Sequence, residues 1–424
     1  MYLNLTRLKE KYFVLFLGFI ALVVRLIYWS HTGIKLGGDS GEYLKWAQNF
    51  AVGNYSAFKS YPFHQVYAIF LSPIYVASID KSFYIKYSHV VVSTLTVLLL
   101  FFIGKKLVSK SYGALVALLA CFYPSLLFWM PYVLTETLYI FLLLLFVFLF
   151  IEQLDEIHIM GSIGCLCMGA LLFFARPTSI IVLAISILFM VYKILDKRFE
   201  GKKIRTLLFI FSMVVIVVIS LSVIISKNNK IKKWIFHNPT IVQSLWLSVN
   251  LETNDIAENI KVLRDREKRL RESLGVGCTQ KAVMKKKMRD ALGFISTHPF
   301  LYLAKAAKRF SAFWFPWLYA STWSSVHRIV DILLSLFLTV GAIMAFVNKK
   351  MRNTKAWYIM FLALGFGVLS AFSQIDTDVR YRFPSEIMLL LLAPYGWMFV
   401  FKKLWWRRTM ASKYVLLDTQ TKCS

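Results

Sequence analysis

Blocks of apolar residues, most of them close to twenty residues long, alternate with short polar stretches along most of the chain. A helix of about 20 residues crosses the roughly 30 Å of hydrocarbon in a bilayer, and lipid cannot hydrogen-bond a backbone that is not helical. The pattern therefore predicts an all-α polytopic membrane protein. We expect ten spans, at residues 12–29, 84–104, 113–130, 133–151, 157–174, 178–194, 206–226, 326–347, 356–373 and 383–401.

A shorter apolar run at 64–79 is interrupted by Pro73. Short cytoplasmic loops of membrane proteins are rich in Lys and Arg. With ten spans and a cytoplasmic amino terminus, the basic clusters between Lys105 and Lys355 face the cytoplasm, whereas an extra crossing at 64–79 would turn them all outward. We therefore expect a juxtamembrane helix at 64–79 and both termini in the cytoplasm, with an eleventh span as the alternative.

The topology divides the chain into parts that differ in their exposure to water. They are a transmembrane module at 1–226 with a catalytic outer loop at 30–83, an outward helical subdomain at 227–325, a second transmembrane module at 326–401 and a basic cytoplasmic tail at 402–424. Apolar stripes predict helices at 257–274 and 281–297 within the subdomain, and Pro299 should end the second. Residues 227–311 contain 18 Lys or Arg against 7 Asp or Glu, which suits anionic headgroups or an anionic acceptor as well as an ordinary solvated surface.

Composition excludes a soluble protein, because 58% of the 424 residues are hydrophobic and only 17% are charged. A net charge of +28 could suit a nucleic-acid partner, but much of that charge lies in short loops beside the spans. We therefore expect membrane lipids and no nucleic acid as partners. The five cysteines have neither zinc-site spacing nor a disulfide pattern, so no metal site is predicted from them.

The segment after the first span carries candidate acid–base residues. Gly37 and Gly38 allow a sharp turn, and Asp39 then begins a helix that should run to about Val52. The amphipathic face of this helix would hold Asp39 near the bilayer surface. Asp39 and Glu42 also have the spacing of a capping box, so a helix cap is the alternative to a catalytic role.

A second cluster precedes the last span, where Arg380, Tyr381 and Arg382 follow two aspartates, Asp376 and Asp378. Arginine at this depth is costly unless it is paired, and guanidinium groups match phosphate oxygens well. A lipid phosphate could pair them, and salt bridges to the two aspartates are the alternative. Their Asp-Thr-Asp triplet is also found at metal sites of nucleotide-sugar enzymes, but nucleotide sugars are scarce outside the cell. We assign no metal or cofactor, while a divalent metal stays open.

Other ionisable residues should reach the same outer layer. Arg176 lies in a short turn, where it could simply snorkel, and Glu136 could be an ordinary buried hydrogen-bonding group. Ionisable residues inside a membrane are functional hypotheses by default, and a carboxylate that faces guanidinium groups could move a group off a phosphate. The topology places six of them at the outer leaflet: Arg25, Asp39, Glu136, Arg176, Arg380 and Arg382.

In their order along the chain, these motifs resemble the GT-C superfamily of polytopic glycosyltransferases. The similar branch contains the protein O-mannosyltransferases and aminoarabinose-transferase-like enzymes, which use polyprenyl-phosphate sugars. The matching features are Arg25, Gly38–Tyr43, the apolar helix after Pro62, Thr135–Leu138, Ala175–Thr178, His298-Pro299 with Tyr302-Leu303, and Arg380–Pro384. The resemblance implies a GT-C-like helical bundle and transfer of a sugar from the lipid phosphate with inversion at the anomeric carbon.

The resemblance also implies residue roles. Asp39 would be the general base that deprotonates the acceptor hydroxyl. The family often has an acidic residue directly after this Asp, where Ser40 stands here, and it is open whether Glu42 shares the role. Arg176, Arg380 and Arg382 would bind the donor phosphate together with Tyr381, and the further site candidates are Arg25, Tyr43, His64 and Glu136.

The expected protein thus lies in a bacterial plasma membrane with its active site outward. Its donor is a polyprenyl-phosphate sugar, and its acceptor is a lipid, glycan or protein, with the basic loop favouring an anionic one. A lipid-linked glycan ligase or polymerase is the alternative, although it would need no early Asp. A transporter or flippase is less favoured, because transporters often show internal repeats.

Overall fold

The computed structural model describes residues 2–55, 64–77, 79–195, 207, 209–210, 212–214, 246, 248–249, 256–275, 279–315, 325–373 and 379–403. In that part of the chain the regular elements are helices, with one isolated bridge between Lys35 and Tyr132. The first group comprises α1 (Tyr2–Thr32), α2 (Ser40–Ala51), α4 (Gln65–Leu71), α5 (Pro73–Val76), α6 (Lys81–Leu107), α7 (Lys110–Cys121), α8 (Pro124–Phe128), α9 (Glu136–Asp155), α10 (Ile159–Ala175), η1 (Pro177–Ser179) and α11 (Ile180–Leu195). The second comprises α15 (Ile256–Ser273), α16 (Gln280–Thr297), α17 (Pro299–Trp314), α18 (Ser325–Val347), η4 (Lys349–Met351), α19 (Thr354–Ser373) and α20 (Val379–Leu390).

Six of the described helices are long and apolar enough to cross a membrane, and a bent pair at Arg380–Leu390 and Ala393–Lys403 raises the number to seven. The prediction of an all-α polytopic membrane protein is confirmed. The predicted span at 206–226 lies mostly outside the described residues.

The span predicted at 113–130 is wrong as a single helix. The chain ends α7 at Cys121 and starts the short α8 at Pro124. Tyr123 between them is extended, with φ −65° and ψ 119°, because the ring of a following proline disfavours the helical conformation. The predicted span 157–174 forms α10, whose 17 residues put it among the shorter apolar helices.

The run at 64–79 forms α4 and α5, which meet at Ser72 and Pro73. Together they make an apolar helical stretch, Gln65–Val76, that is shorter than the candidate spans. This length agrees with the predicted juxtamembrane helix rather than with an eleventh crossing.

Helices α6 and α9 form the middle of the bundle, where α6 contacts α1, α7 and α9. Small residues allow the closest approach: a Cβ added at Gly104 of α6 would lie 2.9 Å from Cα of Gly113 in α7, as is common where membrane helices pack. On the other side, α19 contacts α11, α17 and α20.

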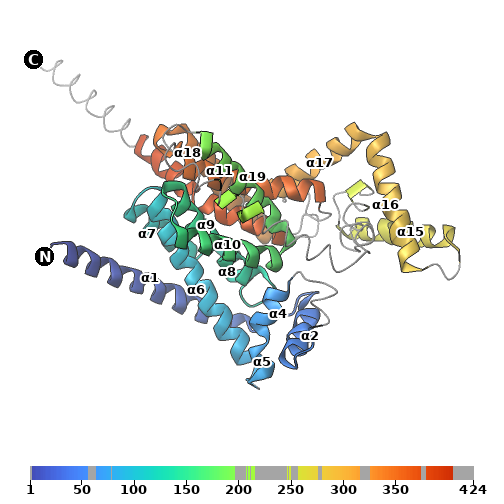
Figure 1. Ribbon diagram of the computed structural model, residues 1–424, viewed down its shortest axis with the longest axis horizontal. Coiled ribbons are helices and arrows are strands. Elements are labelled where there is room, and N and C mark those ends of the chain that lie inside the picture. Colours follow the sequence, from blue (N-terminus) through green and yellow to red (C-terminus); the bar gives the residue numbers. More distant parts are fainter. Residues whose placement is uncertain are drawn as a thin grey trace, which may run out of the picture.

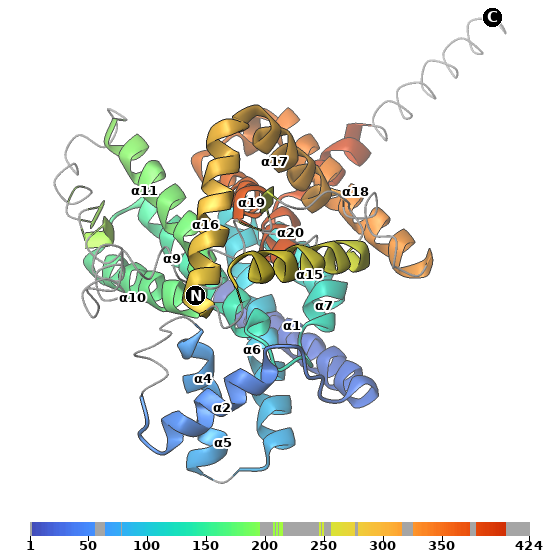
Figure 2. The same cartoon turned by 90° about the vertical axis from the view of Figure 1, so that its right-hand side faces the viewer.

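The helices predicted at 257–274 and 281–297 are present as α15 and α16, and the chain breaks before Pro299 as expected. Figure 1 shows that α15 and α16 lie at the end of the molecule opposite the N-terminus. Helices α2 and α4 lie at the same end, which faces the viewer in Figure 2. The fold therefore gathers the predicted outer segments at one end of the bundle.

Candidate functional site

The loop between α1 and α2 is fastened to the segment that precedes α9. Lys35 donates its backbone N–H to the Pro131 carbonyl (2.9 Å), and Val133 donates its N–H to the Lys35 carbonyl (3.0 Å). The Ser40 hydroxyl donates to the Val133 carbonyl and accepts from the Gly37 N–H, each at 2.8 Å. Because the Ser40 hydroxyl makes both hydrogen bonds, it fixes the turn that contains Asp39.

Asp39 stands at the start of α2, but its side chain makes no capping hydrogen bond. The capping-box alternative is therefore wrong. Its Oδ2 instead lies 3.5 Å from Nη1 of Arg380, and the side chains of Asp39 and Arg380 are 56% and 27% exposed. Two predicted site residues from opposite ends of the chain are thus neighbours, and Glu42 is exposed on the first turn of the same helix.

Arg176, directly after α10, is held by the start of α9. Its Nε donates to Thr135 Oγ1 (2.9 Å), and its NH2 forms a short ion pair with Glu136 Oε1. The guanidinium carbon lies 5.3 Å from the centre of the Tyr139 ring. Burial lowers the pKa of Arg176, but the Glu136 carboxylate raises it, and the net pKa is above the ordinary value of arginine. Arg176 is therefore a fixed, largely buried cation rather than a snorkelling side chain.

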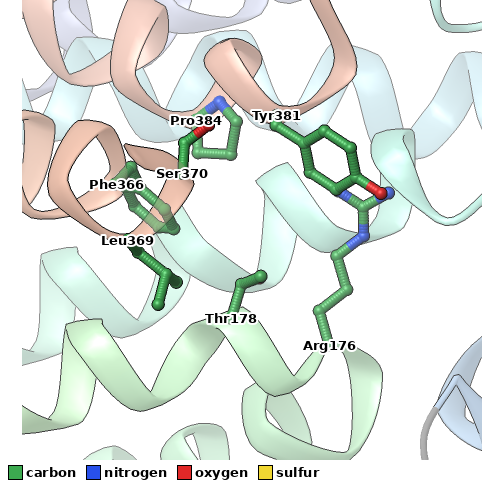
Figure 3. A pocket seen from close by; sticks show the side chains of 7 residues that line it. All are labelled: Arg176, Thr178, Phe366, Leu369, Ser370, Tyr381 and Pro384. Atoms are coloured by element: carbon green, nitrogen blue, oxygen red, sulfur yellow. The ribbon is translucent and has the colours of Figure 1, made fainter. Parts of the chain in front are cut away.

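The Arg176 guanidinium lies at one side of a small pocket. Figure 3 shows the Tyr381 hydroxyl turned toward Arg176, and the two groups are close enough to interact electrostatically. The pocket is charged at this side, and elsewhere apolar side chains are mixed with the hydroxyl residues Thr178 and Ser370. Its lining residues are Arg176, Thr178, Phe366, Leu369, Ser370, Tyr381 and Pro384.

His64 and Tyr43 form a wall next to these groups. His64 has a φ of 64°, which is uncommon for a residue with a Cβ, and its N–H donates to the Phe174 carbonyl (2.8 Å). The Tyr43 ring lies 5.9 Å from the His64 ring and 5.3 Å from that of Tyr67. Burial, together with the charge of Arg176, lowers the pKa of His64 to about 3, so the imidazole is neutral.

Arg382, which was predicted to bind the donor phosphate, is paired with two carboxylates in the structure. Its side chain is 7% exposed, its Nε donates to Glu386 Oε1 (2.6 Å), and its other nitrogens pair with Asp331 of α18. Glu386 also accepts hydrogen bonds from the hydroxyls of Tyr123 (3.0 Å) and Ser125 (2.6 Å). The bonds to Glu386 and Asp331 occupy the Arg382 guanidinium and join α20 to α18. The bonds of Glu386 to the two hydroxyls join α20 to the start of α8.

Our sequence reasoning missed Glu386 and Asp331. Glu386 could have been found, because it lies four residues after Arg382 on one helix and such pairs face each other. Asp331 is far away in sequence and left no local signal. The expected alternative partners, Asp376 and Asp378, lie outside the described residues.

Arg25, a further site candidate, joins neighbouring helices in the structure. It is fully buried and donates to Ser93 Oγ (2.7 Å) and to the carbonyls of Ala21 (3.1 Å), Cys121 (3.4 Å) and Ala120 (3.5 Å). These acceptors belong to α1, α6 and α7, so Arg25 joins three helices. Within the part of the chain that the structure describes, no group of three or more His, Cys, Asp or Glu residues could hold a metal ion.

Known proteins that are similar to this chain are found by comparing structures and not by comparing sequences. No protein-family model and no curated sequence matches it. The archaeal oligosaccharyltransferase AglB from Archaeoglobus fulgidus, solved with an inhibitory peptide and a dolichol-phosphate, is similar with a TM-score of 0.52 and 13% identity, over 95% of this chain and 52% of that one. The apo oligosaccharyltransferase of Archaeoglobus fulgidus gives a TM-score of 0.48 and 12% identity, over 95% and 51%.

The chain spans about half the length of these structures. At this level of identity the likeness to AglB shows the fold, and the expected GT-C architecture is confirmed. Similar folds host different chemistry, so the function has to be argued from the site itself.

Proposed function

We propose that the protein is a membrane glycosyltransferase that moves a sugar from a polyprenyl-phosphate carrier to an acceptor on the outer side of the membrane. The observation that carries this proposal is the approach of Asp39 and Arg380 beside the Arg176 pocket. A carboxylate and two guanidinium groups from three distant segments thus lie in one region, since Tyr43, one turn after Asp39, and Tyr381, next to Arg380, are both close enough to Arg176 to interact electrostatically. The fold, which is shared with an oligosaccharyltransferase solved with a dolichol-phosphate, supports the proposal.

The donor phosphate binds between Arg176 and Arg380. Arg176 is preorganised, because Thr135 and Glu136 already fix two of its nitrogens. The Tyr381 hydroxyl adds a neutral donor at the same side of the pocket. As the bond between the anomeric carbon and the phosphate oxygen breaks, charge develops on the phosphate, and preplaced cations in a water-poor cleft stabilise it.

Asp39 acts as the general base. The acceptor hydroxyl attacks the anomeric carbon from the face opposite the phosphate, its proton passes to the carboxylate, and the polyprenyl phosphate leaves. Asp39 is 56% exposed, as a base that meets an incoming acceptor must be. Glu42 lies one turn along α2 and is the second carboxylate available to an acceptor.

We place the site outward on charge grounds. At the other end of α9 from Glu136, Glu152 pairs with Lys106 and Asp155 pairs with Lys355. These lysines belong to the short basic loops that favour the cytoplasmic side. The described parts of α15 and α16 expose Lys268, Arg269, Arg271, Lys285 and Arg289 at the site end, which suits an anionic acceptor.

The test is Asp39→Asn. Membranes from cells that express the protein are incubated with an isotope-labelled polyprenyl-phosphate sugar, and release of polyprenyl phosphate is followed. We expect the variant to insert normally and to lose transfer, because the amide cannot take the proton. Transfer at the wild-type rate by Asp39→Asn would remove Asp39 from the base role.

A further inference from the structure

Glu136, the first residue of α9, has a buried carboxylate whose two oxygens differ. The side chain is 1% exposed, and Oε1 pairs with Arg176. Oε2 is buried and has no hydrogen-bond partner among the described residues. Burying a carboxylate with an unsatisfied oxygen costs folding stability. The proposed reaction, as described so far, gives Glu136 no role.

Together with Thr135, Glu136 sets the orientation of Arg176. Thr135 Oγ1 holds Nε at 2.9 Å and Glu136 Oε1 holds NH2, while the Tyr139 ring supports the face of the guanidinium. The group can therefore rotate little without breaking two bonds, and it enters the pocket in one pose. Such a group needs no reorganisation when charge develops in front of it.

Glu136 also cancels the charge of Arg176. The Asp39–Arg380 pair also joins opposite charges, so these four groups together carry no net charge before the donor arrives. The donor is a phosphodiester with one negative charge, whereas the released polyprenyl monophosphate approaches two at neutral pH, since its second pKa is about 6. A more positive pocket would therefore hold the product more strongly than the donor.

We infer that Glu136 is a positioning residue that orients Arg176 and, through its negative charge, keeps the pocket weak enough in positive charge for the polyprenyl monophosphate to leave. This inference rests on the proposed function. It predicts that removing the charge of either of two neighbouring residues changes product binding in opposite directions. Loss of the Arg176 charge weakens product binding, and loss of the Glu136 charge strengthens it.

The experiment measures binding of a polyprenyl monophosphate to the purified full-length protein in lipid nanodiscs, alongside turnover of the labelled donor. In Glu136→Gln, which keeps an oxygen for Arg176 but loses the charge, we expect binding to tighten by about 10-fold or more, since at an effective dielectric constant of about 20 a unit charge still has a tenfold effect on a single phosphate charge roughly 12 Å away. The kcat should fall because release is slow, and the donor KM should not rise. Arg176→Gln should bind the monophosphate more weakly than the wild type.

Glu152→Gln is the matched control. It makes the same change on the same helix. Like Glu136, Glu152 is ion-paired, with Lys106, but it lies at the opposite end of α9. Binding and turnover should stay at wild-type values. Glu136→Asp keeps the charge but shortens the side chain, so it should not tighten product binding, and it should raise the donor KM severalfold.

The outcomes separate the two ideas. If the wild type binds the monophosphate and Glu136→Gln binds it equally or more weakly, the inference is wrong and the proposed function stands. If Glu136→Gln fails to fold, unchanged donor KM in Glu136→Asp overturns the positioning role instead. If the wild type binds no polyprenyl monophosphate, the proposed function fails and the inference with it.

Discussion

Arg380 and Arg382 lie two residues apart on α20, and replacing each with methionine should affect different properties, donor binding for Arg380 and stability for Arg382. Arg382→Met removes a guanidinium that is 7% exposed from between Asp331, 11% exposed, and Glu386, 5% exposed. Both carboxylates then lose a charged partner inside the bundle. Removal of one partner from a buried ion pair costs about 3–5 kcal/mol of folding free energy. Asp331 should suffer most, since Glu386 keeps its bonds to Tyr123 and Ser125.

Arg380→Met should cost little stability. Its contact with Asp39 is 3.5 Å long, and the two side chains are 27% and 56% exposed. Exposed pairs of this kind contribute about 0–1 kcal/mol. On the proposed function, however, the variant loses a charge-assisted bond to the donor phosphate, worth about 1.5–3 kcal/mol. The apparent donor affinity should therefore fall on the order of 10- to 100-fold.

The assay is equilibrium unfolding in mixed micelles for each variant, followed by binding of a labelled lipid-phosphate donor in the same preparations. The triple replacement Arg382→Met, Asp331→Leu and Glu386→Leu should recover most of the stability lost in Arg382→Met, because apolar residues of similar volume often replace a buried charge cluster without loss. An Arg382→Met protein with wild-type stability and weakened donor binding would refute the assignment and return Arg382 to the phosphate site.

Three smaller changes test the rest of the site. Ser40→Ala removes the hydroxyl that joins Gly37 to Val133, so kcat should fall severalfold at unchanged donor KM, and an unchanged kcat would show that the turn needs no such bond. Tyr381→Phe should raise the donor KM about 3- to 10-fold, the worth of one neutral hydrogen bond, and a wild-type KM would remove the hydroxyl from the site. The pKa of His64 is lowered from 6.5 in the unfolded chain to about 3, so its contribution to stability is present above pH 6.5 and is lost as the pH falls toward 3. His64→Gln should therefore unfold less steeply on acidification than the wild type, and equal pH dependence of unfolding would contradict this.

The sequence was informative where structure depends on local pattern. The apolar stripes of α15 and α16 and the break at Pro299 follow from residue spacing alone. The 113–130 span failed because its average hydropathy hides Pro124, whose effect falls on the backbone of Tyr123 and not on polarity. Predicting the number of membrane crossings therefore requires the backbone conformation as well as the composition.

The partners of the arginines could not be derived in the same way. Asp39 and Arg380 were both expected at the outer surface, but their approach depends on how α2 and α20 pack. Arg382 looked equivalent to Arg380, and it differs only because α18 brings Asp331 beside it. Hydropathy gives the depth of a charged residue, and the direction in which it points decides what it binds.

Exposure ranks the three arginines by how readily each can exchange its partner. Arg382 is 7% exposed and Arg176 11%, and both are bonded to buried carboxylates. Arg380 is 27% exposed, and its carboxylate is 56% exposed. An arriving phosphate must replace existing bonds, so it exchanges most easily with Arg380. Because the group displaced there is Asp39, donor binding on the proposed function also releases the base, and the acceptor is deprotonated only when a leaving group is in place.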